Sequence, residues 1–208
     1  MRKFLSVILL FIVACYAQAG TVLVLGDSLS AGYGLAAGEG WVSLLQQRLE
    51  QRGLGHTVVN ASISGDTTAG GLARLDAVLD QHRPDWLLLE LGANDGLRGL
   101  SLTAMRDNLN EMVMRATARG IKVVLIGIQI PPNYGRVYTE RFTAVYRELA
   151  TRHRLPFVPF LMEKVALDPA LIQADQLHPN ALAQPLLLDT VWPVLEKTMQ
   201  DSTFKIQN

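Results

Sequence analysis

The chain has 208 residues, of which 49% are hydrophobic, and its 19 basic residues balance its 19 acidic residues. Without an excess of positive charge it lacks the electrostatic footprint of a nucleic-acid-binding protein, and it has no polybasic patch for an anionic membrane. Its single cysteine, Cys15, excludes an intramolecular disulfide. Because histidine and cysteine do not cluster, we expect neither a structural metal nor a cofactor.

The first 19 residues are typical of a secretory signal peptide. Two basic residues precede an apolar run that ends at Ala14, and a small-residue Ala-Gln-Ala motif ends at Ala19. The run is about 11 residues long, too short for the roughly 20 that span a bilayer as a helix. We therefore expect cleavage after Ala19 and a periplasmic or secreted protein. An alternative is a bacterial lipoprotein box at residues 12–15, with Cys15 as the lipidated residue.

Short apolar runs predict the strands of a parallel sheet. They are residues 21–25, 57–60, 86–91, 121–128 and 157–160. Near-continuous apolar sequence indicates strands buried on both faces, as parallel sheets require. The last run is the weakest, and Pro159 favours an edge position because proline cannot donate to a sheet ladder.

Amphipathic stretches separate these strands. Apolar residues recur there at helical spacing, in the sets Leu72, Leu75 and Leu79; Met105, Leu109, Met112 and Ala116; and Phe142, Val145, Tyr146 and Leu149. Gly53 and Gly120 stand where glycines commonly end helices. Alternating strands and helices predict an α/β fold, a three-layer α/β/α sandwich with a five-stranded parallel sheet. No repeat or linker indicates a second domain, so residues 20–208 are expected to form one.

Four loops follow strands, at residues 26–34, 61–68, 92–99 and 129–136. All should emerge at the same edge of a parallel sheet, where open α/β sheets bind their ligands. The first carries Ser28 in the sequence Gly-Asp-Ser-Leu, and a later segment, Asp-Gln-Leu-His, carries Asp175 and His178. A serine hydroxyl, a histidine base and an orienting carboxylate are the groups required for nucleophilic acyl transfer. The sequence therefore predicts a serine hydrolase.

These segments, in this order, resemble the SGNH (or GDSL) hydrolases. By motif, Ser28 resembles the nucleophile, Gly65 and Asn94 the glycine and asparagine of the middle blocks, and Asp175 and His178 the final Asp-x-x-His. The sequences of residues 92–99, 130–142 and 178–185 further resemble the bacterial periplasmic branch of thioesterases, lysophospholipases and arylesterases. The resemblance implies a flavodoxin-like sandwich, a Ser-His-Asp triad and no cofactor. It also implies small acyl ester, thioester or lysophospholipid substrates.

A tetrahedral intermediate needs hydrogen-bond donors for its oxyanion. The candidates are the backbone N–H groups of Ser28 and Gly65 and the side-chain amide of Asn94. Glycine at position 65 permits an unusual backbone angle and a close substrate approach. The roles of other nearby side chains stay open. Tyr33, Tyr134 and Tyr138, with Leu97, Leu100 and Met162, could form an acyl groove or simply pack.

Two groups of residues are assigned structural roles. Three aspartates of the loops, Asp27, Asp66 and Asp95, are expected to accept hydrogen bonds from backbone amides. The remaining histidines, His56, His82 and His153, are expected at the surface.

Two other functions remain open from the sequence. One is a carbohydrate O-acetylesterase with the same triad. The other is a non-catalytic periplasmic module that binds anions with residues 26–34, although this loop lacks the P-loop and GxGxxG spacings. We expect a monomer without a stable membrane span.

Overall fold

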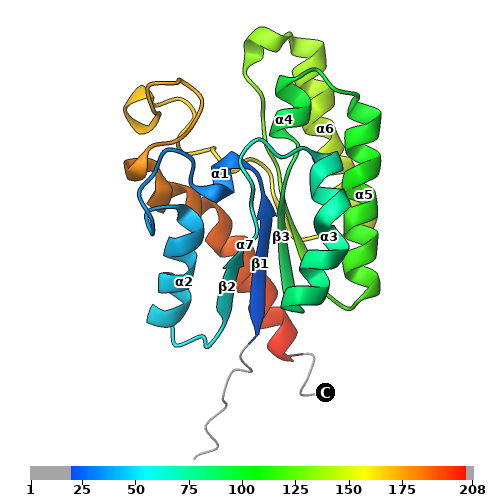
Figure 1. The fold of residues 1–208 in the computed structure, drawn as a ribbon, viewed down its shortest axis with the longest axis vertical. Coiled ribbons are helices and arrows are strands. Elements are labelled where there is room, and N and C mark those ends of the chain that lie inside the picture. Colours follow the sequence, from blue (N-terminus) through cyan, green and yellow to red (C-terminus); the bar gives the residue numbers. More distant parts are fainter. Residues whose placement is uncertain (1–19, 205–208) are drawn as a thin grey trace, which may run out of the picture.

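The computed structural model describes residues 20–204, and the predicted signal peptide and Cys15 lie outside them. Five parallel strands form one sheet in the order β2-β1-β3-β4-β5 (Figure 1). The strands are β1 (Thr21–Gly26), β2 (Thr57–Asn60), β3 (Trp86–Glu90), β4 (Lys122–Ile126) and β5 (Phe157–Val158). This order is that of flavodoxin-like sheets, and the predicted fold class is confirmed.

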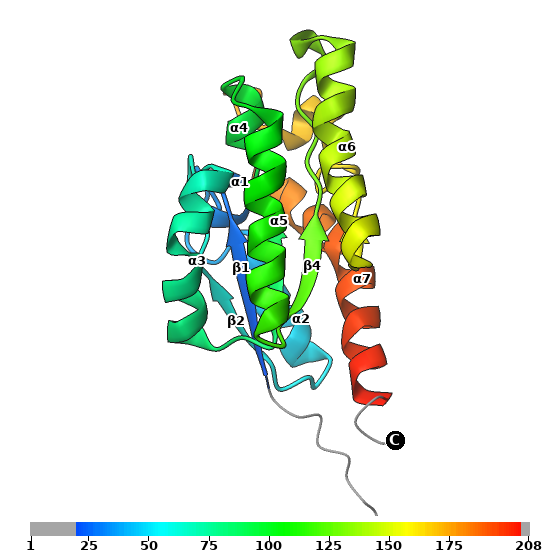
Figure 2. The ribbon, with the colours of Figure 1, turned by 90° about the vertical axis from the view of Figure 1, so that its right-hand side faces the viewer.

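Helices cover both faces of the sheet. The long ones are α2 (Trp41–Gln51), α3 (Thr68–His82), α5 (Leu102–Ala118), α6 (Arg136–His153) and α7 (Gln184–Phe204). Helices α2 and α7 lie on one face, and α3, α5 and α6 lie on the other (Figures 1 and 2). In residues 20–204, no helix combines the length and apolar character that crossing a membrane requires.

The alternation of side chains along the strands explains the two layers of the core. Leu23 and Leu25 of β1 pack toward α3, α5 and α6, whereas Val22 and Val24 pack toward α2 and α7. Both faces of β1 and β3 are buried, as the apolar runs predict. The prediction of burial is wrong for β2, whose Thr57 and Asn60 are exposed. β2 is an edge strand that pairs only with β1, so less of its surface is covered.

The last two strands are shorter than predicted. β5 has two residues and lies at the sheet edge, the position that Pro159, directly after it, favours. β4 ends at Ile126, two residues before the end of the predicted run. The chain at Gly127 passes close to β5, and a Cβ there would lie 2.4 Å from the carbonyl oxygen of Pro159. Gly127 still donates its N–H to the carbonyl of Val158 at 2.7 Å and accepts from the N–H of Leu161 at 2.9 Å, so its backbone remains hydrogen-bonded to the segment of β5 after β4 ends.

The helix ends expected at Gly53 and Gly120 are confirmed, since both residues follow helices with φ of +66° and +78°. His82 and His153 are the last residues of α3 and α6. The surface assignment is wrong for His56, which is only 6% exposed. Its Nδ1 accepts a hydrogen bond from the backbone N–H of Gly20 at 3.0 Å, and its ring packs edge-on against Trp86.

Candidate active site

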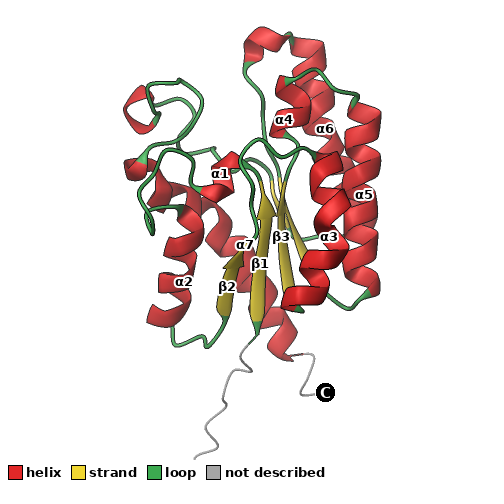
Figure 3. Ribbon diagram, viewed as in Figure 1, coloured by secondary structure: helices red, strands yellow, loops and turns green. Residues whose placement is uncertain are grey.

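The loops that follow the strands gather at the carboxyl edge of the sheet (Figure 3). Two of the predicted loops contain short helices, α1 (Ser28–Ala31) and α4 (Ala93–Leu97). They are too short to show a helical period in the sequence. Three 3₁₀ helices complete this edge: η1 (Pro132–Tyr134), η2 (Pro169–Leu171) and η3 (Ala181–Ala183).

Ser28 is the first residue of α1, and Asp27 alone separates it from the end of β1. Asp27 caps this helix, because its Oδ1 accepts a hydrogen bond from the backbone N–H of Leu29 at 3.1 Å. Gly32 ends the helix in the left-handed conformation, with φ of +78°. The first N–H groups of a helix have no carbonyl acceptor within that helix. The backbone N–H of Ser28 is one of them, so it can donate to a ligand.

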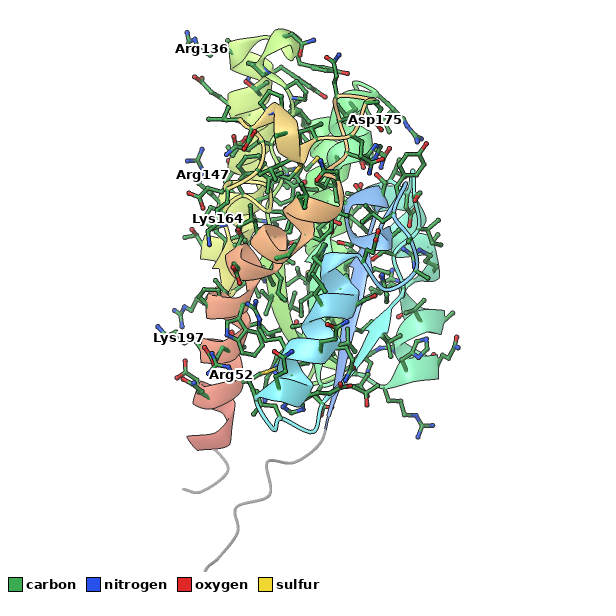
Figure 4. The ribbon with its side chains drawn as sticks, turned by 90° about the vertical axis from the view of Figure 1, so that its left-hand side faces the viewer. Arg52, Arg136, Arg147, Lys164, Asp175 and Lys197 are labelled. Carbon is green, nitrogen blue, oxygen red and sulfur yellow. The ribbon has the colours of Figure 1, made fainter. Side chains whose placement is uncertain are left out.

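The structure brings Ser28, His178 and Asp175 together. The Oγ of Ser28 lies 2.9 Å from Nε2 of His178, and Nδ1 of His178 lies 2.6 Å from Oδ2 of Asp175. Asp175 comes from the loop between η2 and η3, at the opposite end of the molecule from Lys197 on α7 (Figure 4). A hydroxyl, an imidazole and a carboxylate are thus joined in one hydrogen-bonded chain.

The turn from Asp175 to His178 fixes the charge of the carboxylate. Oδ1 of Asp175 accepts hydrogen bonds from the backbone N–H groups of Leu177 and His178, both at 3.0 Å. The backbone N–H of His178, aided by its imidazole and by Leu177, lowers the pKa of Asp175 to about 2. Asp175 is therefore ionised at neutral pH. Gln176 closes the turn with a positive φ of 58°.

His178 is also supported from the first loop. The rings of Tyr33 and His178 are 4.5 Å apart between centroids. Gln173 joins the two segments, since its Nε2 donates to the carbonyl oxygens of Tyr33 at 2.8 Å and Pro179 at 3.0 Å. The role of Tyr33 stays open from the sequence, and Gln173 is not among the residues predicted for the site. No local pattern marks this glutamine, because its partners lie in two separate segments.

Gly65 and Asn94 face the same pocket as Ser28. Gly65 has a φ of +81°, the backbone angle for which a glycine was expected. The Nδ2 of Asn94 donates to the backbone carbonyl of Asp66 at 2.9 Å and, over a longer 3.4 Å, to Oδ2 of Asp27. The three residues predicted to supply oxyanion donors, Ser28, Gly65 and Asn94, therefore line one pocket.

This pocket has a volume of about 300 Å³ and a largely apolar lining that includes Leu97 and Met162. Leu100 is 44% exposed and lines a different groove. The hydroxyls of Tyr134 and Tyr138 donate to the carbonyls of Leu97 and Gly96, which anchors α4 to η1 and to the start of α6. Of the six side chains left open, Tyr33, Leu97 and Met162 line the pocket.

Buried acids lie directly behind the pocket. Asp27 and Asp95 accept from the backbone N–H groups of Leu29 and Thr68, so the structural assignment is confirmed for these two. Asp66 instead forms an ion pair with Arg74 at 2.8 Å. Burial raises the pKa of Asp27 to about 7. Burial also raises the pKa of Glu90, a residue not predicted for the site, well above its usual range.

The fold and this arrangement of side chains define an ester hydrolase. The profile of the GDSL-like lipase/acylhydrolase family matches residues 24–184, and the chain belongs to this family. It is 51% identical over 180 residues to esterase TesA of Pseudomonas aeruginosa, covering 86% of this chain and 90% of that protein.

Two further similarities extend this result. The chain is 47% identical over 173 residues to thioesterase 1/protease 1/lysophospholipase L1 of Escherichia coli strain K12, covering 83% of this chain and 82% of that one. A crystal structure of the psychrotrophic esterase EstA from Pseudoalteromonas sp., inhibited by monoethylphosphonate, superposes with a TM-score of 0.83 at 42% identity. That match covers 87% of this chain and 99% of EstA.

Proposed function

We propose that the protein hydrolyses carboxylic esters and thioesters through an acyl-enzyme formed on Ser28. The hydrogen-bonded chain from the Ser28 hydroxyl through His178 to Asp175 is the observation that carries this proposal. Nε2 of His178 accepts the hydroxyl proton while Oγ attacks the carbonyl carbon. The imidazolium then protonates the leaving alkoxide or thiolate. Water, deprotonated by the same nitrogen, releases the acid and restores Ser28.

The ionised Asp175 has two tasks in this scheme. It holds the proton of His178 on Nδ1, which leaves Nε2 free to accept the proton of Ser28. It also stabilises the imidazolium that forms during acylation. The short contact of 2.6 Å and the lowered pKa of Asp175 support both tasks.

The oxyanion would be bound by the backbone N–H groups of Ser28 and Gly65 and by the amide of Asn94. The 2.9 Å bond to Asp66 fixes the orientation of this amide. The 3.4 Å contact with Asp27 is longer than an ordinary N–H···O hydrogen bond, so that hydrogen can turn to a substrate oxygen. Donors held in place before the reaction stabilise developing charge without reorganisation.

The substrate class follows from the pocket lining. Apolar side chains, among them Leu97, Met162 and Leu177, suit an acyl chain better than a sugar, whose hydroxyls need polar partners. Thioesters and lysophospholipids are included because the Escherichia coli relative is named for both activities. The partner is thus a small acyl ester or thioester, and we expect the protein to act as a monomer.

Hydrolysis of p-nitrophenyl esters from acetate to palmitate, with an acyl-CoA and a lysophospholipid, tests this proposal. Ser28→Ala should abolish turnover, and Ser43→Ala, on α2 away from the site, should not. A preference for medium or long chains supports the lipid and thioester assignment. Activity confined to acetate would favour the carbohydrate O-acetylesterase. Binding of phosphate esters without turnover by the folded protein would favour the anion-binding module.

We also propose that the protein is exported after cleavage following Ala19. The basic start, apolar run and small-residue motif of residues 1–19 support this proposal. Mass spectrometry of the N-terminus of the protein from its own host would test it. A chain that begins at Gly20 is expected, whereas a chain that begins at a diacylated Cys15 would establish the lipoprotein alternative.

A further inference from the structure

Glu90 is a fully buried carboxyl group at the carboxyl end of β3. In the sheet register it pairs with Gly26, two residues before Ser28. Strand alternation places Glu90 on the same face as Trp86 and Leu88, which pack in the layer of α2 and α7 together with Leu29 of α1. Glu90 therefore lies on the face of the sheet that α1 covers.

One oxygen of Glu90 holds the turn on both sides of Ser28. Its Oε2 accepts a hydrogen bond from the backbone N–H of Asp27 at 3.3 Å and another from the hydroxyl of Ser30 at 2.6 Å. Asp27 in turn caps α1 and contacts the amide of Asn94. The carboxyl of Glu90 is thus connected to the nucleophile turn directly and to one oxyanion donor through Asp27.

Gly26 provides the room for this contact. A Cβ at Gly26 would lie 2.5 Å from Oε2 of Glu90 and 2.8 Å from Cβ of Ser30. Such distances are too short for any packed side chain, so the glycine of the Gly-Asp-Ser-Leu motif is needed for the approach of Glu90. The motif and the glutamate on the neighbouring strand form one packed unit.

Packing alone does not explain a carboxyl group here. A buried carboxyl is unfavourable unless it is hydrogen-bonded, and apolar residues, most of them leucine or valine, fill the buried positions around it in β1, β3 and β4. Among the described residues, Oε1 of Glu90 has no hydrogen-bond partner. The interactions that offset burial are those of Oε2, and both go to the turn that carries Ser28.

We propose that Glu90 is a positioning residue that holds the turn of Asp27 and Ser30 and thereby fixes the Ser28 hydroxyl in its reactive geometry. This inference rests on the proposed function, because it assigns Glu90 a role in the same reaction. Glu90 does not line the acyl pocket. Its removal should therefore change kcat and leave KM nearly constant.

Three variants measure this role. Glu90→Leu removes the acceptor and should lower kcat on the order of 100-fold, since small misplacements of reacting groups have effects of this size. Glu90→Gln retains an acceptor oxygen, so its kcat should be at least about tenfold higher than that of Glu90→Leu. Ser30→Ala removes one of the two contacts and should lower kcat about tenfold. The turnover of a medium-chain p-nitrophenyl ester gives kcat and KM for each.

Labelling with a p-nitrophenyl phosphonate separates positioning from folding. A positioning defect leaves one label per chain but slows the labelling, whereas a folding defect lowers the labelled fraction. Leu88→Ala, on the same strand and face, should lower the melting temperature and keep the wild-type kcat per labelled serine.

Each outcome bears on one proposal. Wild-type kcat per labelled serine in both Glu90→Leu and Ser30→Ala would overturn the role of Glu90. If Glu90→Leu does not fold, an unchanged kcat in Ser30→Ala is sufficient to overturn the proposed role of Glu90. Ser28→Ala is assayed beside them, and activity in that variant would instead overturn the proposed function.

Discussion

The carboxylate of Asp175 holds His178 at two points, the ring Nδ1 at 2.6 Å and the backbone N–H at 3.0 Å. Asp175→Asn has one acceptor oxygen in place of two, so it cannot satisfy both contacts. An amide N–H that faces Nδ1 favours the wrong tautomer of the imidazole. We therefore expect kcat to fall by about 10²–10⁴ with little loss of stability.

Asp168→Asn is the matched control for this variant. Asp168 accepts from the backbone N–H of Ala170 at 2.9 Å in a neighbouring loop and does not contact His178. Its replacement should leave kcat unchanged. If Asp175→Asn lowers kcat by no more than about threefold, the loss is far smaller than the expected 10²–10⁴. That result would show that His178 does not depend on Asp175.

Asn94→Ala tests the third proposed oxyanion donor. The loss of one such donor typically lowers kcat by about 10²–10³, and KM should change little because the amide acts on the transition state. Asn110→Ala serves as the control. Asn110 lies on α5, and its replacement removes a side-chain contact with His153. Circular dichroism checks the fold of both. An inactive Asn94→Ala protein that is also unfolded would refute the assignment of Asn94 to catalysis.

The parts of the protein that the sequence predicts best are those encoded by local patterns. β1, β3 and β4 appear as apolar runs because both of their faces are covered. The residues of the proposed triad stand in short motifs with fixed spacing. Helices α1 and α4 are missed because four or five residues show no period, and their partners lie elsewhere in the chain. The burial of His56 likewise depends on Trp86, from another strand.

Two features could be found only from the three-dimensional structure. Glu90 reads as one charged residue at the end of an apolar strand, and its role emerges from the register that pairs it with Gly26. Pro193 argues against a helix, yet it lies within α7. Proline lacks the N–H that would reach the carbonyl of Asp189, and that carbonyl instead accepts from Nζ of Lys164 at 3.1 Å. The compensating residue is remote in the sequence.

Gly65→Ala separates backbone strain from catalysis. A Cβ at Gly65 would meet only an ordinary contact, Nη2 of Arg98 at 3.5 Å, so the penalty arises from the φ of +81° and amounts to about 1–2 kcal/mol. Gly53→Ala at the end of α2 has a similar φ of +66°, and no atom of the described residues lies within 4 Å of its Cβ. Urea unfolding should show similar losses of stability for both variants.

Only Gly65→Ala should also lower kcat, because Gly65 lines the pocket and is proposed to supply an N–H to the oxyanion. The same esters serve for this comparison. Equal kcat values for the two alanine variants would remove Gly65 from the proposed oxyanion site and leave it a structural glycine.

The buried Asp27 should make the protein more stable in mild acid than at neutral pH. Its pKa is raised by burial from 3.8 to about 7, with Asp66 and Asp95 acting in the same direction. Between these values the folded state keeps the proton that the unfolded state releases. The free energy of unfolding therefore falls as the pH rises from about 4 to about 7, by at most about 1.4 kcal/mol per pH unit for one group.

Asp27→Asn tests this linkage, because an amide does not titrate. Urea unfolding at several pH values from 4 to 8 should give a flatter profile for the variant than for the wild type. Asp175, with its pKa lowered to about 2, acts in the opposite direction and only below about pH 4, so its contribution lies outside this window. Parallel profiles for the two proteins would mean that Asp27 is already ionised in the folded state at pH 4.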